Sequence, residues 1–141
     1  MRFVDTNVLL YAISTVPEER AKSRTALSAL DHEDLALSVQ VLQEFYVRAT
    51  RGAKHDRLSH DQATLLIESF LRFAVQEMTL KLMKSALATK ERFRISYWDA
   101  AIIEAAREMG CDTILSEDLN HGQDYAGVNV INPFRNIRPR A

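Results

Sequence analysis

Short apolar runs alternate with helical segments along the whole chain, and this alternation constrains the fold more than any other feature. Five runs have the length and composition of strands, at residues 3–4, 35–37, 75–78, 113–115 and 128–131. The segments between them have the spacing of helices, and connections of that kind join parallel strands. The pattern predicts an α/β fold with a mainly parallel central sheet of four to five short strands and helices on both faces.

Local signals indicate where several of these helices begin and end. Pro17 suits a first helical position, and Ser38 is placed to cap the helix that follows the second strand. Ser59 has the capping-box spacing to Gln62, three residues later. Gly52 and Gly110 are suited to ending helices, because glycine readily adopts the left-handed conformation found there.

Composition and charge describe an ordinary folded protein. The chain has 141 residues, of which 47% are apolar and 26% charged, enough for one substantial core and too few for two. We expect one domain over residues 1–141, with an Arg- and Pro-containing tail from about Pro133. A single cysteine, Cys111, and the lack of a long apolar stretch at the N-terminus predict a cytoplasmic protein that does not enter the membrane. Because the net charge is −1, contact with nucleic acid would need a local basic patch.

Four acidic residues lie where an open α/β sheet binds its ligands. Asp5 and Asp118 follow predicted strands, and Glu44 and Asp99 lie near the starts of helices, so all four are expected at the carboxyl edge of the sheet. Carboxylates brought within about 5 Å repel by roughly 3 kcal/mol per pair at an effective dielectric near 20. Such a cluster holds protons or binds a hard cation, and Mg²⁺ or Mn²⁺ is the usual solution. The cluster predicts metal-dependent chemistry.

Each acidic residue also has a simpler explanation when it is taken alone. Asp5 would cap the next helix, Glu44 would pair with Arg48 one helical turn later, and Asp118 would belong to a turn. Asp99 would form a capping-box-like pair with Ser96. These alternatives stay open for the single residues, and only their combination favours a common site.

The surroundings of the acidic residues supply further candidates. Thr6, Asn7 and Ser116 are polar side chains placed to support the cluster. Basic residues recur every three positions near the end of the Glu44 helix, and these are candidate contacts for RNA phosphates: Arg48, Arg51, Lys54 and Arg57. Glu117 is expected to face the solvent, and Tyr97 and Trp98 are expected to pack in the local core rather than to stack on bases.

In combination, the sequence resembles the PIN-domain ribonucleases, and most closely the VapC toxins of VapBC toxin–antitoxin pairs. The matching stretches are Asp5–Tyr11, Leu42–Tyr46, Ser96–Ile102, Leu115–Gly122 and Asn132–Phe134. They cover almost the whole chain in the order and at the spacing of the family. Residues 51–60 match nothing informative, so the choice of substrate stays open.

This resemblance implies a function and a set of site residues. Asp5, Glu44, Asp99 and Asp118 would form the acidic catalytic site, with Asp5, Asp99 and Asp118 holding Mg²⁺ or Mn²⁺. Ser116 stands where the family often has Thr or Ser. The activity implied is metal-dependent cleavage of RNA, and the partners implied are a VapB-like antitoxin and a second copy of the chain in a homodimer.

Other classes fit the sequence less well. A haloacid-dehalogenase-type phosphatase would need a second aspartate at position 7, where this chain has Asn7. A non-catalytic phosphoacceptor domain would need an acidic pair after the first strand and a late lysine at a strand end. A PIN fold used only as a binding module would have lost an acidic residue. A housekeeping RNA-processing nuclease stays open as the alternative to a toxin.

One helix is expected to take part in contacts with a partner. Its apolar stripe, which we expect to be mostly core, consists of Ala63, Leu66, Ile67, Phe70 and Leu71. Leu65 and Phe73 broaden it beyond what a thin sheet needs. Together with the short helix 8–13, these additional residues are predicted to form a groove for an antitoxin helix or a second subunit.

Overall fold

The described residues, 1–51 and 57–137 of this computed structural model, contain one sheet with the strand order β3-β2-β1-β4-β6-β5. Its strands are β1 (Arg2–Val4), β2 (Leu35–Ser38), β3 (Ala74–Gln76), β4 (Thr113–Leu115), β5 (Asp124–Tyr125) and β6 (Val128–Ile131). Strands β3, β2, β1, β4 and β6 pair in parallel, and β5 pairs antiparallel with β6. The chain therefore adds β2 and β3 on one side of β1, and then β4, β6 and β5 on the other.

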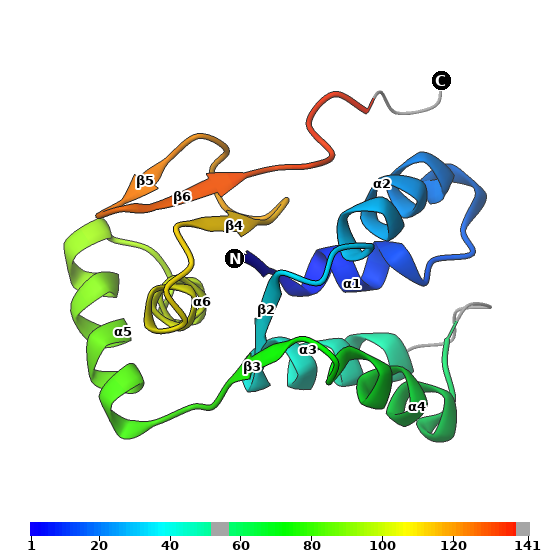
Figure 1. Cartoon of the computed structure of the whole chain (residues 1–141), viewed down its shortest axis with the longest axis horizontal. Coiled ribbons are helices and arrows are strands. Elements are labelled where there is room, and N and C mark those ends of the chain that lie inside the picture. The colour runs from blue at the N-terminus through cyan, green and yellow to red at the C-terminus, as the bar shows by residue number, and fades with distance from the viewer. Residues whose placement is uncertain (52–56, 138–141) are drawn as a thin grey trace.

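Helices cover both faces of this sheet (Figure 1). Helix α6 packs against β2, β4 and β6, with α5 beside it, whereas α1, α2 and α3 lie on the other side and α4 packs against α3. Their bounds are α1 (Thr6–Ala12), the 3-10 helix η1 (Pro17–Glu19), α2 (Arg20–Leu30), α3 (Val39–Thr50), α4 (His60–Phe70), α5 (Leu80–Phe93) and α6 (Tyr97–Glu108). None of the helices in the described ranges has both the length and the apolar character that a membrane span requires.

The α/β class with a mainly parallel sheet is confirmed, and one strand was not expected. The count of four to five strands missed β5, whose two residues are too few for a period-two pattern. The caps at Ser38 and Ser59 are confirmed, the second as a complete capping box with Gln62. Gly110 follows α6 with a φ of 75°, as a residue after a helix end often does. Gly52 lies outside the described residues.

The core lies on the two central strands and under α6. Phe3, Val4, Ile114 and Leu115 are almost completely buried, as expected of strands covered on both faces. Four alanines of α6 are equally buried, and their small side chains let the helix approach the sheet closely: Ala100, Ala101, Ala105 and Ala106. This packing fixes the position of the start of α6, which is also the position of Asp99.

A polar network outside the acidic region ties α6 to the turn between β5 and β6. Arg107 pairs with the buried carboxylate of Glu104 at 3.1 Å and donates to the carbonyls of Tyr125 and Ala126 at 2.7 Å each. Thr89 of α5 donates to Glu104 Oε2 at 3.0 Å. Ala126 has a φ of 53°, which is unusual for a residue other than glycine. Arg107 therefore holds a strained turn in place.

We expect Arg107→Met to lower the free energy of unfolding by about 2–4 kcal/mol, because it leaves the Glu104 carboxylate buried beside one neutral donor. Urea unfolding measures this loss. Lys81→Met is the matched control, because it breaks the exposed bridge from α5 to Glu108 and should cost less than about 1 kcal/mol. Equal effects of the two substitutions would contradict a structural role for the Arg107 network.

Candidate active site

The carboxyl ends of β1 and β4 lie side by side and bring two of the predicted acidic segments together. Val4 pairs with Leu115 in the register of these strands, and the backbone N–H of Asp5 donates to the Leu115 carbonyl at 3.0 Å. From this pair the chain continues to β2 on one side and to β6 on the other, the arrangement in which a crevice between the two connections is expected. In open α/β sheets this reversal of strand order is where ligands bind.

Asp5 is buried at the centre of this edge, with both carboxylate oxygens hydrogen-bonded. Its Oδ1 accepts from the backbone N–H of Thr6 at 2.7 Å, and its Oδ2 accepts from the hydroxyl of Ser116 at 2.7 Å. Burial raises the pKa of Asp5 to about 6, against the effect of these two hydrogen bonds, and the charges of Asp118 and Glu44 add to the rise. Asp5 also caps α1. Its capping role is therefore compatible with a place in a common acidic site.

Ser116, Thr6 and Asn7 connect Asp5 to the other acidic residues. Buried Ser116 also accepts from the backbone N–H of Asp118 at 3.1 Å, which shapes the turn after β4. The Thr6 hydroxyl donates to Glu44 Oε2 at 2.9 Å, and the Asn7 amide donates to Asp118 Oδ2 at 3.2 Å. Each of the three supporting residues predicted from the sequence thus contacts a predicted acidic residue.

Asp99 approaches the same region from the start of α6. Its backbone N–H donates to Ser96, which caps the helix as predicted. Burial raises the pKa of Asp99, and the negative charges of Asp118 and Glu44 add to this rise. Asp118 and Glu44 thus raise the pKa of both Asp5 and Asp99. This agrees with the hydrogen bonds that link the segments carrying the four acidic residues.

The four carboxylates surround this region without closing on a single point. Within the described ranges, no three Asp, Glu, His or Cys side chains converge as a metal-binding set. The donors nevertheless fit a hard divalent cation, because they are oxygens and are oriented by Thr6, Asn7 and Ser116. Burial is the main cause of the raised pKa of Asp5, and the charges of Asp118 and Glu44 add to the rise, so a bound cation would favour the ionised carboxylate.

A fourth supporting residue, Gln40, holds Glu44 and was not predicted from the sequence. Its buried side chain lies one helical turn before Glu44 on α3, donating through Nε2 to Glu44 Oε1 at 3.0 Å and to the Trp98 carbonyl at 3.2 Å. Its Oε1 is buried without a protein partner. Glu44 is half-buried and bonded to Gln40 and Thr6 rather than paired with Arg48. The i, i+4 spacing of Gln40 and Glu44 was the available signal.

Two expectations about neighbouring residues were wrong. Glu117 is half-buried, because it accepts from the Tyr11 hydroxyl at 2.6 Å and pairs with Lys22 at 2.7 Å. Lys22 lies 95 residues away in the sequence, so no local pattern indicated this pair. Trp98 was expected in the local core and is 62% exposed, because the buried face of α6 is supplied by its alanines and isoleucines.

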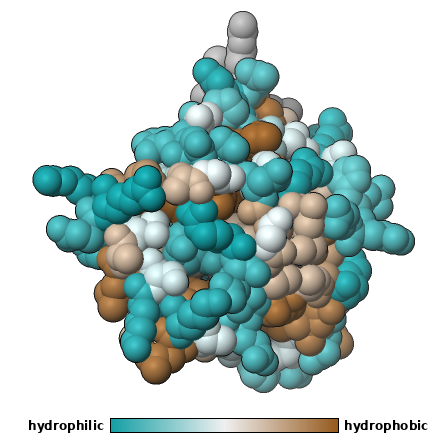
Figure 2. All heavy atoms as spheres, turned by 60° about the vertical axis from the view of Figure 1, so that its left-hand side comes forward, coloured by the Kyte–Doolittle hydropathy of each residue, from teal (hydrophilic) through white to brown (hydrophobic). Residues whose placement is uncertain are grey.

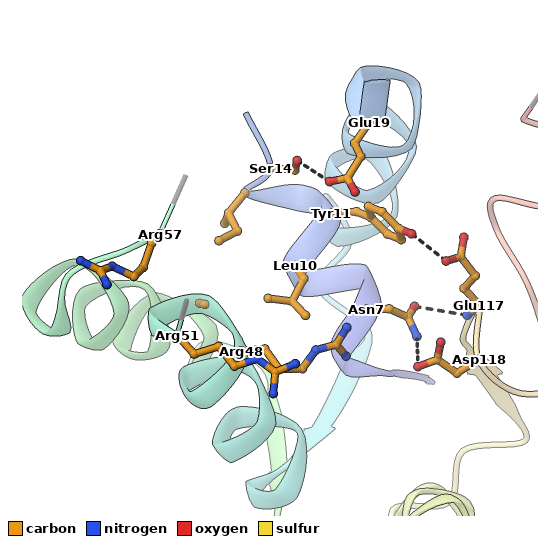
Figure 3. A pocket seen from close by; sticks show the side chains of 12 residues that line it. Asn7, Leu10, Tyr11, Ser14, Glu19, Arg48, Arg51, Arg57, Glu117 and Asp118 are labelled. Atoms are coloured by element: carbon orange, nitrogen blue, oxygen red, sulfur yellow. Dashed lines mark hydrogen bonds between the residues drawn. The ribbon is translucent and has the colours of Figure 1, made fainter. Parts of the chain in front are cut away.

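A pocket of about 500 Å³ opens beside the acidic region, between α1 and α3 (Figure 3). Asn7 and Asp118 line one side, with Leu10 on α1, and Arg48 and Arg51 extend from α3 on the opposite side. Arg57 also lines the pocket, farther from Asp118. Three of the four predicted RNA-contacting residues therefore share one cavity with two residues of the acidic region. The fourth, Lys54, lies outside the described residues.

A family model for the PIN domain matches residues 2–124. The chain belongs to the PIN domain family. The match includes Asp5, Glu44, Asp99 and Asp118, and so spans all of the acidic region described above. The resemblance found in the sequence and the sheet order found in the structure therefore agree.

Solved structures with the same fold include three from toxin–antitoxin systems. A toxin–antitoxin complex from Klebsiella pneumoniae has a TM-score of 0.69 and 19% identity, over 94% of this chain and 98% of that one. The sarcin-ricin loop cleaving toxin VapC20 of Mycobacterium tuberculosis has a TM-score of 0.66 and 23% identity, over 84% of this chain and 92% of that one. The DNA-bound VapBC of Salmonella typhimurium has a TM-score of 0.61 and 17% identity, over 92% of this chain and 95% of that one. None of the curated proteins matches the chain in sequence. At these identities the likeness to the solved structures shows a shared PIN fold.

Proposed function

We propose that this PIN domain protein is a Mg²⁺- or Mn²⁺-dependent endoribonuclease and the toxin of a type II toxin–antitoxin pair. The observation that carries the proposal is the hydrogen-bond network that links the segments of Asp5, Glu44, Asp99 and Asp118 at one edge of a PIN fold. One solved neighbour with this fold is described as a toxin–antitoxin complex, and another as a toxin that cleaves the sarcin-ricin loop.

Asp5, Asp99 and Asp118 would hold the cation. When bound, it would lower the pKa of a water molecule and offset negative charge on the scissile phosphate. The chain's own contribution is to orient these carboxylates before the substrate arrives. Ser116 fixes Asp5, and Asn7 fixes Asp118, so few side-chain rotations have to be frozen at the moment of reaction.

Glu44 is proposed to orient the attacking water. Its two oxygens are held by Gln40 and Thr6, and it is only half-buried, so lone pairs stay available toward the crevice. A carboxylate held in this way can accept a proton from water in a fixed direction.

Arg48, Arg51 and Arg57 are proposed to hold phosphates of the RNA next to the acidic region. They line the pocket that ends at Asn7 and Asp118, so a strand lying across α3 would reach the carboxylates with its phosphates already neutralised. Arginine suits this role because its planar guanidinium donates to phosphate with two parallel hydrogen bonds. Lys54 is proposed to join them.

The proposed partners are a VapB-like antitoxin and a second copy of the chain in the cytoplasm. Helix α5 carries three exposed apolar side chains at one-turn intervals, Leu80, Met83 and Leu87. Figure 2, in which the side that carries α5 comes forward, shows apolar areas exposed among hydrophilic ones. Such a stripe suits a homodimer, because covering it removes apolar surface from water. A housekeeping RNA-processing nuclease is the alternative, and the nature of the adjacent gene product distinguishes the two.

Chelation tests the metal dependence directly. We expect the purified protein to cleave single-stranded or looped RNA in Mg²⁺ or Mn²⁺, because a crevice of this size does not reach a bond buried in regular duplex. EDTA should stop cleavage, and excess Mg²⁺ should restore it. A protein inactivated by unfolding would not recover in this way, so restoration separates metal loss from damage. Cleavage that survives exhaustive chelation would contradict the proposal.

A further inference from the structure

Trp98 is a large aromatic side chain exposed beside the acidic region. It is the single tryptophan of the chain and is 62% exposed, although tryptophan is highly buried on average. It occupies the first turn of α6 and directly precedes Asp99. A nucleotide bound with its phosphate near Asp99 would therefore have its own base, or the next one, within reach of this ring.

The position of Trp98 is fixed by contacts to the same residues that form the acidic region. Its carbonyl accepts from Gln40 Nε2 at 3.2 Å, and that nitrogen also donates to Glu44. Its ring meets the half-buried ring of Tyr97 edge to face, with 5.0 Å between the centroids and 85° between the planes. A ring held in this way offers one face to a ligand with little loss of side-chain freedom on binding.

Basic side chains lie at the end of α5, shortly before Trp98 in the chain. Lys90 and Arg94 are exposed at the end of α5, where they line a hollow together with Glu91 and Ile95. Only residues 94–96 separate α5 from α6. Proteins hold single-stranded nucleic acid by combining a positively charged surface with exposed aromatic rings, because phosphates follow the charge and bases stack on the rings.

We propose that the indole of Trp98 is a stacking platform for a nucleobase of the RNA strand adjacent to the scissile phosphate. The proposal rests on the proposed ribonuclease function, since a base reaches Trp98 only when the strand crosses the acidic region. The strand would then run from the arginine-lined pocket at α3, past Asp99, to Trp98 and the basic end of α5. Stacking accepts any base, so Trp98 positions the strand rather than selecting its sequence.

The fluorescence of the single tryptophan reports the stacking. The full chain carrying Asp5→Asn is titrated with an oligouridine of about ten nucleotides, and binding is followed separately by the anisotropy of a dye on the RNA. We expect saturable quenching with the same midpoint as the anisotropy change. An abasic oligomer of equal length should bind more weakly and leave the fluorescence unchanged, because it has phosphates but no base to stack.

Substitutions separate stacking from general packing in a wild-type background. Trp98→Ala should weaken RNA binding by about 5- to 150-fold, the range measured for a lost base–aromatic stack, and raise KM with a smaller change in kcat. Trp98→Phe should recover most of this loss, whereas Trp98→Leu should not. Leu27→Ala is the matched control, because Leu27 is 54% exposed on α2, which lies on the other side of the sheet from α6.

The possible outcomes are distinct. RNA that binds without quenching, or a Trp98→Ala variant with wild-type KM, overturns the stacking platform and leaves the ribonuclease proposal intact. Fluorescence that shifts with protein concentration alone means that a second copy covers Trp98, which also overturns it. Failure of the wild-type protein to bind or cleave any RNA overturns the ribonuclease proposal and the stacking platform with it.

Discussion

Asp5→Asn is expected to reduce metal-dependent RNA cleavage by at least ~1000-fold, since an interaction with a catalytic cation contributes several kcal/mol to the transition state. The same substitution should stabilise the metal-free protein. Asn at position 5 keeps a side-chain oxygen for the backbone N–H of Thr6 and gives up only the acceptor of the Ser116 hydroxyl. The fold should therefore survive while the charge is lost.

The gain in stability follows from the raised pKa of Asp5. Burial raises the pKa from 3.8 to about 6, so between these values the folded protein holds a proton that the unfolded chain has lost. Stability therefore falls as the pH rises through this window, and the full cost of the charge is present above about pH 6. Without metal, Asp5→Asn should raise the free energy of unfolding by about 1–3 kcal/mol at pH 7.5 and by almost nothing below pH 4.

Urea unfolding in EDTA at the two pH values measures this difference. Asp31→Asn is the matched control, because Asp31 is an exposed carboxylate at the end of α2 and its loss should change neither stability nor cleavage. Wild-type cleavage by Asp5→Asn in saturating Mg²⁺ would remove Asp5 from the site. A loss of stability at pH 7.5 would show that its charge is not a burden to the fold.

The sequence predicted the parts of this structure that depend on short-range rules. Strand-length apolar runs and the caps at Ser38 and Ser59 were each readable from a few neighbouring residues, and each is present. The position of acidic residues at strand ends also followed from local order, because parallel strands place all their carboxyl ends at one edge.

The structural features that the sequence did not predict depend on contacts between distant segments. The pairing of Lys22 with Glu117 joins residues 95 positions apart, and no local sequence pattern around either residue predicts the other as its partner. Trp98 was wrongly expected in the core because its side chain is hydrophobic. The alanines of α6 already fill the space against the sheet. Phe73, expected at a partner surface, is buried, whereas Leu65 on the predicted helix is exposed as expected.

Loss of cleavage in a complex with the product of the adjacent gene is the second large effect that we expect. The pocket beside the acidic region has an apolar wall, with Leu10 and Ile13 from α1, and ends at Asp118. An antitoxin segment that packs apolar side chains on this wall would bring a basic side chain to the carboxylates. That side chain would take the place proposed for the cation, and opposite charges brought together at a desolvated site bind tightly.

Co-expression with the adjacent gene, followed by copurification and an RNA cleavage assay of the complex, tests this inhibition. Leu10→Arg should still cleave RNA, because it adds positive charge to the pocket, but should weaken the complex at least ~10-fold by removing an apolar contact and adding repulsion. Leu27→Arg is its control, because Leu27 is exposed on α2 and does not line the pocket. If the adjacent product neither binds nor suppresses cleavage, the toxin assignment fails, and a housekeeping ribonuclease becomes the better account of the same acidic site.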